Sequence, residues 1–424
     1  MINLNFLREN AETVLSKLKI KNFDASESIQ TILSADRQRR ESQKHLDDNF
    51  AEQNRIAKQI GVLFKEGNTA EANLLKERTS ALKTAAKEME TALSEYEKTI
   101  ENTLVLLPNL PHDSVPKGKT AEDNEMVYSE GDTTFQDWML PHWDLCDKLQ
   151  LVDFETGCKI TGAGFPLYCR KGAHLQRALI NFFLDSAVEA GYAEMQPPYL
   201  VNEDSAYATG QLPDKDGQMY FAGEDKLYLI PTAEVPVTNI YRDMILKDSD
   251  FPIKHCAYSA CFRREAGSYG KDVRGLNRLH QFDKVEIVQI THPDKSYQTL
   301  EEMKLHVADL LRKLELPFRI LRLCGGDMSF TSALTFDFEV FSKGQQRWLE
   351  VSSVSNFEAF QANRMKLRFK AEGGKPQLAH TLNGSALALP RIVAALLENH
   401  QTQNGEILIP KALQNYTGFE RIGN

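Results

Sequence analysis

The chain has 424 residues, with 50 Lys and Arg against 59 Asp and Glu and a formal net charge of −9. Its 42% hydrophobic and 26% charged residues exclude disordered, collagen-like and disulfide-scaffold proteins, and the length suggests two or three globular domains. No apolar run approaches the ~20 residues that span a bilayer, and residues 1–5 lack a signal-peptide core. We therefore expect a cytoplasmic protein without membrane contact. The acidic balance argues against indiscriminate coating of nucleic acid but leaves local recognition open.

Proline and glycine are unevenly distributed along the chain. Residues 1–107 contain no proline and only two glycines, Gly61 and Gly67. All prolines and the remaining glycines, which interrupt helices, lie after residue 107. Two heptad seams, at 29–64 and 72–100, predict two coiled-coil helices. The first seam is polar in its middle and includes Phe50 and Phe64. A helix C-cap at Gly67 predicts a turn between them. We expect 1–107 to form a long antiparallel helical coiled-coil arm, after an amphipathic helix at 4–18; from the heptads alone a scaffold or dimerisation coil is the alternative.

The rest of the chain, 108–424, has a different pattern. A proline-rich stretch at 108–120 is interpreted as a linker. Short β-branched and aromatic segments then predict antiparallel strands at 257–263, 280–290, 335–341 and 348–353. Helical patterns lie between and around them, at 173–190, 234–243, 296–314, 359–369 and 388–401. Strands and helices that do not alternate regularly favour an α+β domain with a helix-flanked antiparallel sheet.

Two neighbouring strands could form a nucleotide site. Arg263 and Glu265 share one face of a strand by period two. Phe282, Lys284 and Glu286 share one face of the returning strand. A guanidinium, an aromatic ring and carboxylates suit a phosphorylated purine together with an amino group. Cross-strand ion pairing beside a core phenylalanine is the structural alternative.

Three further segments carry weaker signals. Glu350 and the serines that follow it, at the end of a predicted strand, could hold Mg²⁺ or simply cap a turn. Small residues before Arg391, at a predicted helix start, could clamp a phosphate, although a solvated arginine would look the same. Thr232 and Glu234 lie where a strand meets a helix, and capping explains them adequately. There is no P-loop, no Gly-x-Gly-x-x-Gly and no Cys-x-x-Cys pair, so a P-loop nucleotide site, a zinc site and a disulfide framework are not indicated.

Taken together, these segments resemble the bacterial type of seryl-tRNA synthetase, a class II aminoacyl-tRNA synthetase, over essentially the whole chain. The Arg-x-Glu segment with its loop looks like class II motif 2, 384–391 like motif 3 and 191–198 like motif 1. Thr232-Ala233-Glu234, the Glu350-x-Ser352-Ser353 box and the helical arm make the seryl resemblance specific. Asn277, Val354 and Asn363 differ from the residues that the family usually has there.

The resemblance implies roles for individual residues. The L-serine site would comprise Thr232, Ala233, Glu234, Arg263, Glu286, Asn383 and Ser385. The ATP site would comprise Arg263, Arg264, Glu265, Phe282, Glu350, Val351, Ser352, Ser353 and Arg391. Glu350 and Ser353 would bind Mg²⁺, and no zinc is expected.

The resemblance also implies an activity and partners. We expect a homodimeric serine–tRNA ligase that forms seryl-adenylate from serine and ATP and transfers serine to the 3′ end of tRNA(Ser), and also of tRNA(Sec). The arm carries 16 basic and 17 acidic residues over 1–110, so it is expected to recognise the long variable arm of the tRNA by shape and backbone contacts. Two alternatives are a class II paralogue that loads a carrier protein and a coiled-coil nucleic-acid-binding protein with a decayed site.

Overall fold

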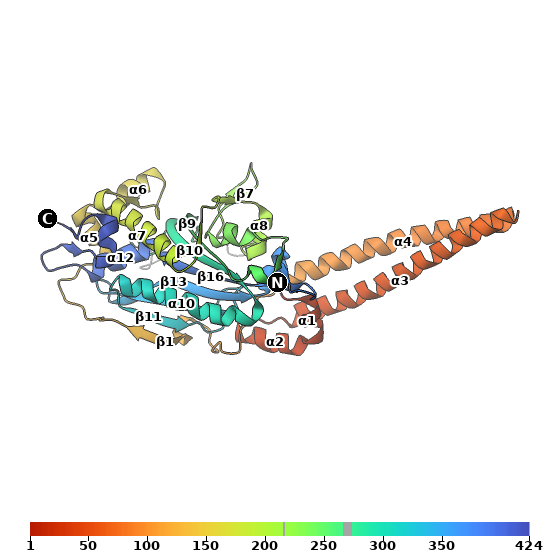
Figure 1. The fold of residues 1–424 in the computed structure, drawn as a ribbon, viewed down its shortest axis with the longest axis horizontal. Helices are drawn as coiled ribbons and strands as arrows, with labels where there is room; N and C mark the ends of the chain where they lie inside the picture. Colours follow the sequence, from red (N-terminus) through yellow and green to blue (C-terminus); the bar gives the residue numbers. More distant parts are fainter. Residues whose placement is uncertain (215–216, 266–273, 424) are drawn as a thin grey trace. The chain divides into compact units, whose positions relative to one another are not determined.

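A computed structural model describes residues 1–214, 217–265 and 274–423 (Figure 1). The chain forms two compact units. The smaller unit consists of Ile2–Lys19 and Phe23–Pro108, and the larger of Met1, Ile20–Asn22 and Asn109–Asn424. None of the helices in the described parts of the chain is long and apolar enough to cross a membrane.

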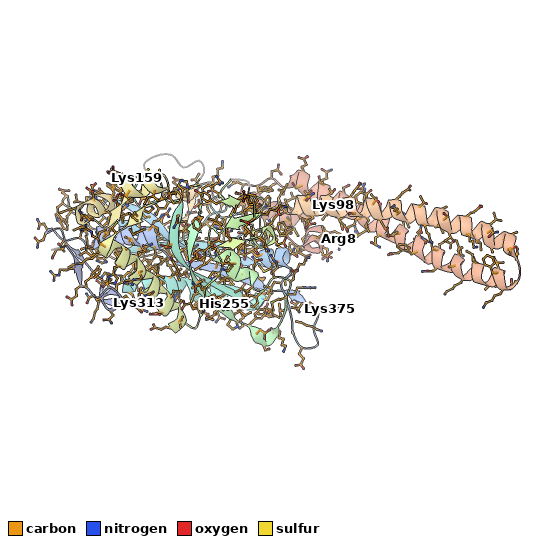
Figure 2. The ribbon with its side chains drawn as sticks, turned by 90° about the horizontal axis from the view of Figure 1, so that it is seen from above. Arg8, Lys98, Lys159, His255, Lys313 and Lys375 are labelled. Atoms are coloured by element: carbon orange, nitrogen blue, oxygen red, sulfur yellow. The ribbon has the colours of Figure 1, made fainter. Side chains whose placement is uncertain are left out.

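The smaller unit is entirely helical. It contains α1 (Leu4–Glu9), α2 (Ala11–Ile20), α3 (Ser26–Lys65) and α4 (Thr69–Leu104). The 40 residues of α3 correspond to about 60 Å of helix, and α4 packs antiparallel along it (Figures 1 and 2). Gly67 has a φ of +79°, and the Asn68 side chain accepts a hydrogen bond from the backbone of Glu71 at 3.4 Å. The predicted hairpin of two long helices is therefore confirmed.

The seam between the two long helices differs in part from the prediction. In α4, Ala72, Ala86 and Ile100 are buried, as expected. In α3 the predicted seam positions Phe50 and Phe64 are 40% and 42% exposed, and Asn49 is buried in place of Phe50. Apolar side chains occur on both faces of this stretch, so the spacing alone does not select the register. Asn49 is accommodated because Gln53 Nε2 donates to its Oδ1 at 2.7 Å.

The helix expected at 4–18 is two helices. The side chain of Asn10 donates to the carbonyl of Phe6 at 3.1 Å, and its backbone N–H donates to the same oxygen at 2.9 Å. Asparagine competes with the helical hydrogen-bond ladder in this way, so α1 ends and α2 begins there.

Charge is also buried in the smaller unit. The carboxylate of Asp36 is fully buried and pairs with three guanidinium groups, those of Arg8, Arg39 and Arg40, at 3.2, 3.0 and 3.1 Å. Burial by itself raises the pKa of Asp36, but hydrogen bonds from Arg39 and Arg8 outweigh this effect, and the pKa lies below its usual value. Arg8, Arg39 and Arg40 therefore compensate an internal charge.

The larger unit is built on an eight-stranded sheet in the order β1-β11-β12-β13-β16-β10-β9-β4. Neighbouring strands are antiparallel except for β4 and β9, which are parallel. The strands are β1 (Glu125–Glu130), β4 (Ala193–Met195), β9 (Ile253–Phe262), β10 (Gln281–Thr291), β11 (Phe318–Arg322), β12 (Leu334–Ser342), β13 (Arg347–Glu358) and β16 (His380–Ala388).

Helices cover both faces of this sheet, and β10 shows how the faces divide. Val285 and Ile287 belong to the main core, which also contains residues of α7 (Arg170–Glu189), α10 (Ser296–Lys313) and α12 (Leu389–Asn399). The alternate residues Val288 and Ile290 pack on the other face. That face meets α8 (Glu203–Thr209), α9 (Glu234–Asn239) and α11 (Phe360–Met365). The expected α+β fold is thus confirmed.

The remaining elements of the larger unit are short. The helices are α5 (His142–Leu149), α6 (Phe154–Ile160) and α13 (Lys411–Thr417). The strands are β2 (Val152–Asp153), β3 (Leu167–Tyr168), β5 (Leu200–Val201), β6 (Phe221–Ala222), β7 (Leu227–Leu229), β8 (Ile245–Lys247), β14 (Arg368–Lys370), β15 (Gln377–Leu378), β17 (Ile407–Leu408) and β18 (Arg421–Ile422).

Several predicted boundaries were wrong. β9 ends at Phe262, so Arg263 lies just beyond the strand. β13 continues to Glu358, which places Glu350 and the serines within a strand and not at its end. The small residues before Arg391 form the central strand β16 and not a helix start, because both edges of this strand pair, with β13 and β10. The helices predicted at 234–243 and 359–369 are shorter, and Arg368–Lys370 pairs with β8 as a strand.

Candidate active site

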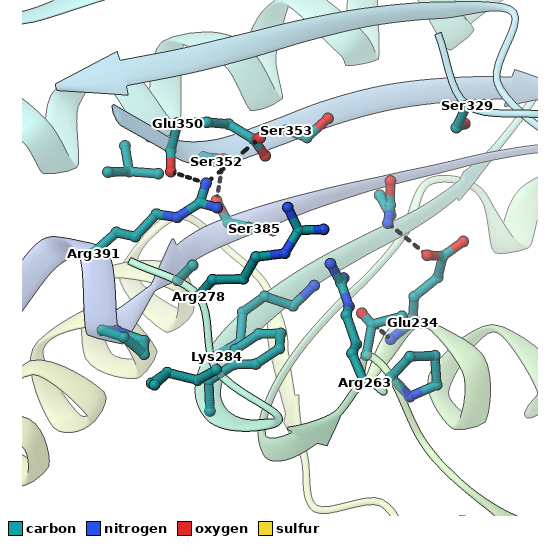
Figure 3. Close-up of a pocket in the computed structure, with 18 of the residues that line it drawn as sticks. Glu234, Arg263, Arg278, Lys284, Ser329, Glu350, Ser352, Ser353, Ser385 and Arg391 are labelled. Atoms are coloured by element: carbon teal, nitrogen blue, oxygen red, sulfur yellow. Dashed lines mark hydrogen bonds and ion pairs between the residues drawn. The ribbon is translucent and has the colours of Figure 1, made fainter. Parts of the chain in front are cut away.

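A cavity of about 600 Å³ opens on the sheet face that α8, α9 and α11 partly cover (Figure 3). Its walls come from β10, β13 and β16, from the segments before α9 and β10, and from the start of α12. The lining includes twelve of the predicted site residues: Thr232, Glu234, Arg263, Glu265, Phe282, Glu350, Val351, Ser352, Ser353, Asn383, Ser385 and Arg391. Residues that lie far apart in sequence thus meet at one site.

One part of the site is built from two buried carboxylates. Asn383 Nδ2 donates to Glu234 Oε2 at 2.7 Å and to Glu286 Oε1 at 3.1 Å. The hydroxyl of Thr232 donates to Glu286 Oε2 at 3.0 Å and accepts from the backbone N–H of Glu234 at 3.2 Å. Lys284 also forms an ion pair with Glu286. Glu286 itself is 1% exposed and lies beneath the residues that line the cavity.

The charge of Glu234 is poorly compensated. Burial and the nearby negative charge of Glu286 raise the pKa of Glu234 to about 7, although the Gln361 hydrogen bond, Lys284 and Arg263 act in the opposite direction. A carboxylate in this environment gains most from a ligand that brings a positive charge and N–H donors. An ammonium group meets both requirements.

The arginine of the predicted motif 2 lies against an aromatic ring. The Arg263 guanidinium carbon is 5.2 Å from the centre of the Phe282 ring. The main chain of Arg263 is fixed as well, because its N–H donates to the carbonyl of His280 at 2.9 Å. Arg263 offers hydrogen-bond donors for a phosphate, and Phe282 beside it offers an aromatic ring on which a base can stack. An adenine nucleotide requires both.

A second cationic region lies along β13 and α12. Arg391 Nη1 donates to the Glu350 carbonyl at 2.6 Å and lies 3.6 Å from its carboxylate, while Nε donates to the Asn277 carbonyl at 3.0 Å. Arg278 forms an ion pair with Glu265. Figure 3 shows the side chains of Arg263, Arg278 and Arg391 directed into the same cavity. Three guanidinium groups suit a polyphosphate.

The residues beside this region fit a magnesium ion. Glu350 and Ser353 lie on β13, and Asp337 of β12 is the direct register partner of Ser353. Asp337 Oδ1 is buried without a hydrogen-bond partner, and burial and the charge of Glu350 raise its pKa well above the usual range. No group of three or more His, Cys, Asp and Glu that could hold a metal occurs among the described residues. Mg²⁺ tolerates such a site because it uses one or two protein oxygens, phosphates and water.

Three predicted site residues do not line the cavity: Glu286, which lies beneath the lining, Arg264 and Ala233. Arg264 Nε donates to the Met219 carbonyl at 3.0 Å, and its guanidinium stacks on Tyr220. Ala233 is buried in a small apolar cluster behind the cavity with Val237. Most of the motif 2 loop, 266–273, lies outside the described residues.

Other lining residues were not predicted. They include Gln211, Gln218, Asn277, Arg278, Lys284, Ser329 and Thr331. Strand alternation places Lys284 on the same face as Phe282 and Glu286, but no role was assigned to it. Ser329 and Thr331 come from a loop that carries no local sequence signal.

Comparisons with known proteins agree with this site. The model of the class II tRNA synthetase core domain (G, H, P, S and T) matches residues 220–400, and that of the seryl-tRNA synthetase N-terminal domain matches residues 1–111. The serine–tRNA ligase of Salinibacter ruber is 51% identical over 100% of this chain and 99% of its own length. That of Chlorobium chlorochromatii is 45% identical over the full length of both chains.

Solved structures give the same result. The crystal structure of seryl-tRNA synthetase from Pyrococcus horikoshii complexed with ATP has a TM-score of 0.95 and 33% identity, covering 100% of this chain and 99% of that one. Matches to both the core and the N-terminal domain disfavour a carrier-protein paralogue and a decayed binding protein. The chain belongs to the seryl-tRNA synthetase family of class II aminoacyl-tRNA synthetases and has serine–tRNA ligase activity.

Proposed function

We propose that the cavity of the larger unit binds serine at its carboxylate end and ATP along the arginine-lined remainder. The observation that carries this assignment is that Glu234 lines the same cavity as Arg263 and Arg391, with the carboxylate of Glu286 directly beneath, joined to Glu234 through Asn383. An amino acid has a cationic end for the carboxylates and an anionic end for Arg263. These charges would point the serine carboxylate toward the α-phosphate.

The chemistry needs positioning more than a protein nucleophile. An oxygen of the serine carboxylate attacks the α-phosphorus, the bond to the bridging oxygen breaks, and pyrophosphate leaves. Arg263 neutralises charge at the α-phosphate while Phe282 stacks on adenine. Arg391, together with Arg278, binds the departing phosphates. A ribose hydroxyl at the 3′ end of tRNA then attacks the carbonyl carbon of serine, and AMP leaves.

Magnesium would be held by Glu350 and Ser353. When bound, it supplies charge neutralisation of the phosphates. The buried carboxylate of Asp337 lies beside Ser353 and has one oxygen without a hydrogen-bond partner. This supports the location, because a cation nearby would satisfy that oxygen.

Selection of serine follows from the same groups. The side chain of Ser385 lines the cavity and can hydrogen-bond the serine hydroxyl, so alanine would leave a buried polar group unpaired. Threonine has the same hydroxyl, and we propose that steric contact with the wall at Thr232 excludes its methyl group.

We propose that residues 1–107 form the tRNA-binding arm and 108–424 the catalytic domain, with 108–120 as the linker. An arm that recognises shape and backbone serves any tRNA with a long variable arm, so tRNA(Sec) is a substrate together with tRNA(Ser). A homodimer is proposed from the motif 1 segment 191–198, which contains β4 at the edge of the sheet. The cytoplasm is the proposed compartment, in keeping with six unpaired cysteines.

ATP–pyrophosphate exchange tests the cavity assignment. We expect exchange that depends on serine and that threonine and alanine support at least 100-fold less well. No exchange with serine, or equal exchange with all three amino acids, would contradict it.

A further inference from the structure

Behind the serine site lies a second layer of buried polar side chains that the proposed reaction does not use. Gln361 of α11 and Thr381 of β16 are each 1% exposed. Neither lines the cavity, and neither belongs to the predicted site. Both nevertheless connect to Glu234 by hydrogen bonds.

The hydrogen bonds form a chain with a defined direction. Thr381 Oγ1 donates to Gln361 Oε1 at 2.7 Å, and Gln361 Nε2 donates to Glu234 Oε1 at 2.7 Å. Gln361 Nε2 also donates to the backbone carbonyl of Thr209 at 3.2 Å. The opposite amide orientation would turn Gln361 Oε1 toward two acceptors, a carboxylate and a carbonyl. The chemistry of the neighbours therefore fixes which end of the amide meets Glu234.

This chain completes the fixation of the Glu234 carboxylate. Gln361 holds Oε1 and Asn383 holds Oε2, both at 2.7 Å. The two donors come from different elements, α11 and β16, which restrains rotation of the carboxylate. Neutral amides fix the group without cancelling its charge, so the charge stays available for a cation.

We propose that Gln361, supported by Thr381, is a positioning residue that holds the Glu234 carboxylate in place for the ammonium group of serine. This inference rests on the proposed function of the cavity. Gln361 acts through Glu234 and does not touch the substrate. Its loss is expected to weaken serine binding while ATP binding is unchanged.

The charged groups around Glu234 predict how pH enters. Glu286 and Lys284 face it from β10 and Arg263 from the end of β9, while α11 contributes the uncharged Gln361. Removing the Gln361 donor takes away an interaction that favours the ionised carboxylate. The pH below which serine is no longer bound should therefore move upward.

The test is steady-state ATP–pyrophosphate exchange by the full chain with a Gln361→Met variant, which conserves volume and removes the donor. We expect the KM for serine to rise about 10- to 100-fold, since hydrogen bonds to charged groups have this magnitude, with the KM for ATP within twofold of the unchanged chain. The acid limb of kcat/KM for serine should shift to higher pH. Thr381→Val should change both quantities in the same direction by less, and Thr381→Ser should restore them.

Gln289→Met is the matched control. Gln289 is also 1% exposed, lies on β10 and donates to the Tyr192 hydroxyl at 2.7 Å on the other face of the sheet. The Gln289→Met variant should have an unchanged KM for serine and an unchanged acid limb in the pH profile of kcat/KM for serine. If Gln361→Met does not fold, as judged by its circular dichroism, the two Thr381 variants decide the question.

An unchanged KM for serine together with an unmoved acid limb in Gln361→Met would overturn the inference. A loss confined to kcat, or an equal loss in Gln289→Met, would do so too. Failure of the proposed function would look different, because the unchanged chain would then show no serine-dependent exchange.

Discussion

The two units bury carboxylates in opposite ways. In the arm, Asp36 is surrounded by three guanidinium groups, and its pKa is lowered. In the cavity, Glu234 and Glu286 share Asn383, and the pKa of Glu234 rises to about 7. A carboxylate whose charge the chain itself compensates stabilises the fold. A carboxylate whose charge is left under-compensated is prepared for a cationic ligand.

We expect the largest loss of activity when the cavity loses an arginine that neutralises the charge of the substrates. Arg263→Ala should lower the rate of adenylate formation at least 1,000-fold, because it removes a charge-neutralising donor at the reacting phosphate. Pyrophosphate exchange measures this loss. Arg312→Ala is the control, since Arg312 pairs with Glu130 outside the cavity. Near-normal exchange in Arg263→Ala would refute its role at the α-phosphate.

Removing most of the arm separates the two units functionally. Deletion of residues 28–101 should leave serine-dependent exchange within a fewfold of the full chain. Charging of tRNA(Ser) should fall at least 100-fold, because the shape-specific contacts to the tRNA are lost. Filter-bound radiolabelled serine measures the second quantity. Charging that survives the deletion would mean that the arm does not bind the tRNA.

The proposed magnesium ligand gives a smaller effect. Glu350→Gln should raise the magnesium concentration at half-maximal exchange about 10-fold or more, because one anionic ligand is lost. The control is Glu130→Gln, which affects a carboxylate paired with Arg312 outside the cavity. An equal magnesium requirement in Glu350→Gln and the unchanged chain would argue against this ligand.

The arm's compensated carboxylate should matter for stability and not for adenylate formation. Asp36→Asn should lower the free energy of local unfolding of the arm by about 1–3 kcal/mol, since three guanidinium groups lose their partner. Hydrogen exchange measures it, and Asp47→Asn, at an exposed position, is the control. Because the pKa of Asp36 is lowered on folding, its contribution is present above the ordinary aspartate pKa of about 4 and is lost as the pH falls through the lower pKa of the folded state. A loss of arm stability between pH 5 and 7 would not come from this residue.

The sequence predicted the arm better than the cavity, and the reason is physical. Helical periodicity is local, so the hairpin and the seam of α4 follow from spacing. Asn49 took the place of Phe50 because side-chain packing between two helices, and not period, sets the register. At the site, Gln361 of α11 and the loop residue Ser329 meet the motif residues only through the packing of segments that are distant in sequence. No local pattern marks such residues, whereas Arg263, Phe282 and Glu286 stand out through the motif 2 resemblance.

Proton release on serine binding tests the central claim most directly. Near pH 7 part of the Glu234 population is protonated, and an ammonium ion bound beside it should lower its pKa. Titration calorimetry in buffers of different ionisation enthalpy should therefore detect a fraction of a proton released per serine, less at pH 8 and none in Glu234→Gln. Serine binding at pH 7 without proton release, or with release that persists in Glu234→Gln, would contradict an under-compensated carboxylate at this position.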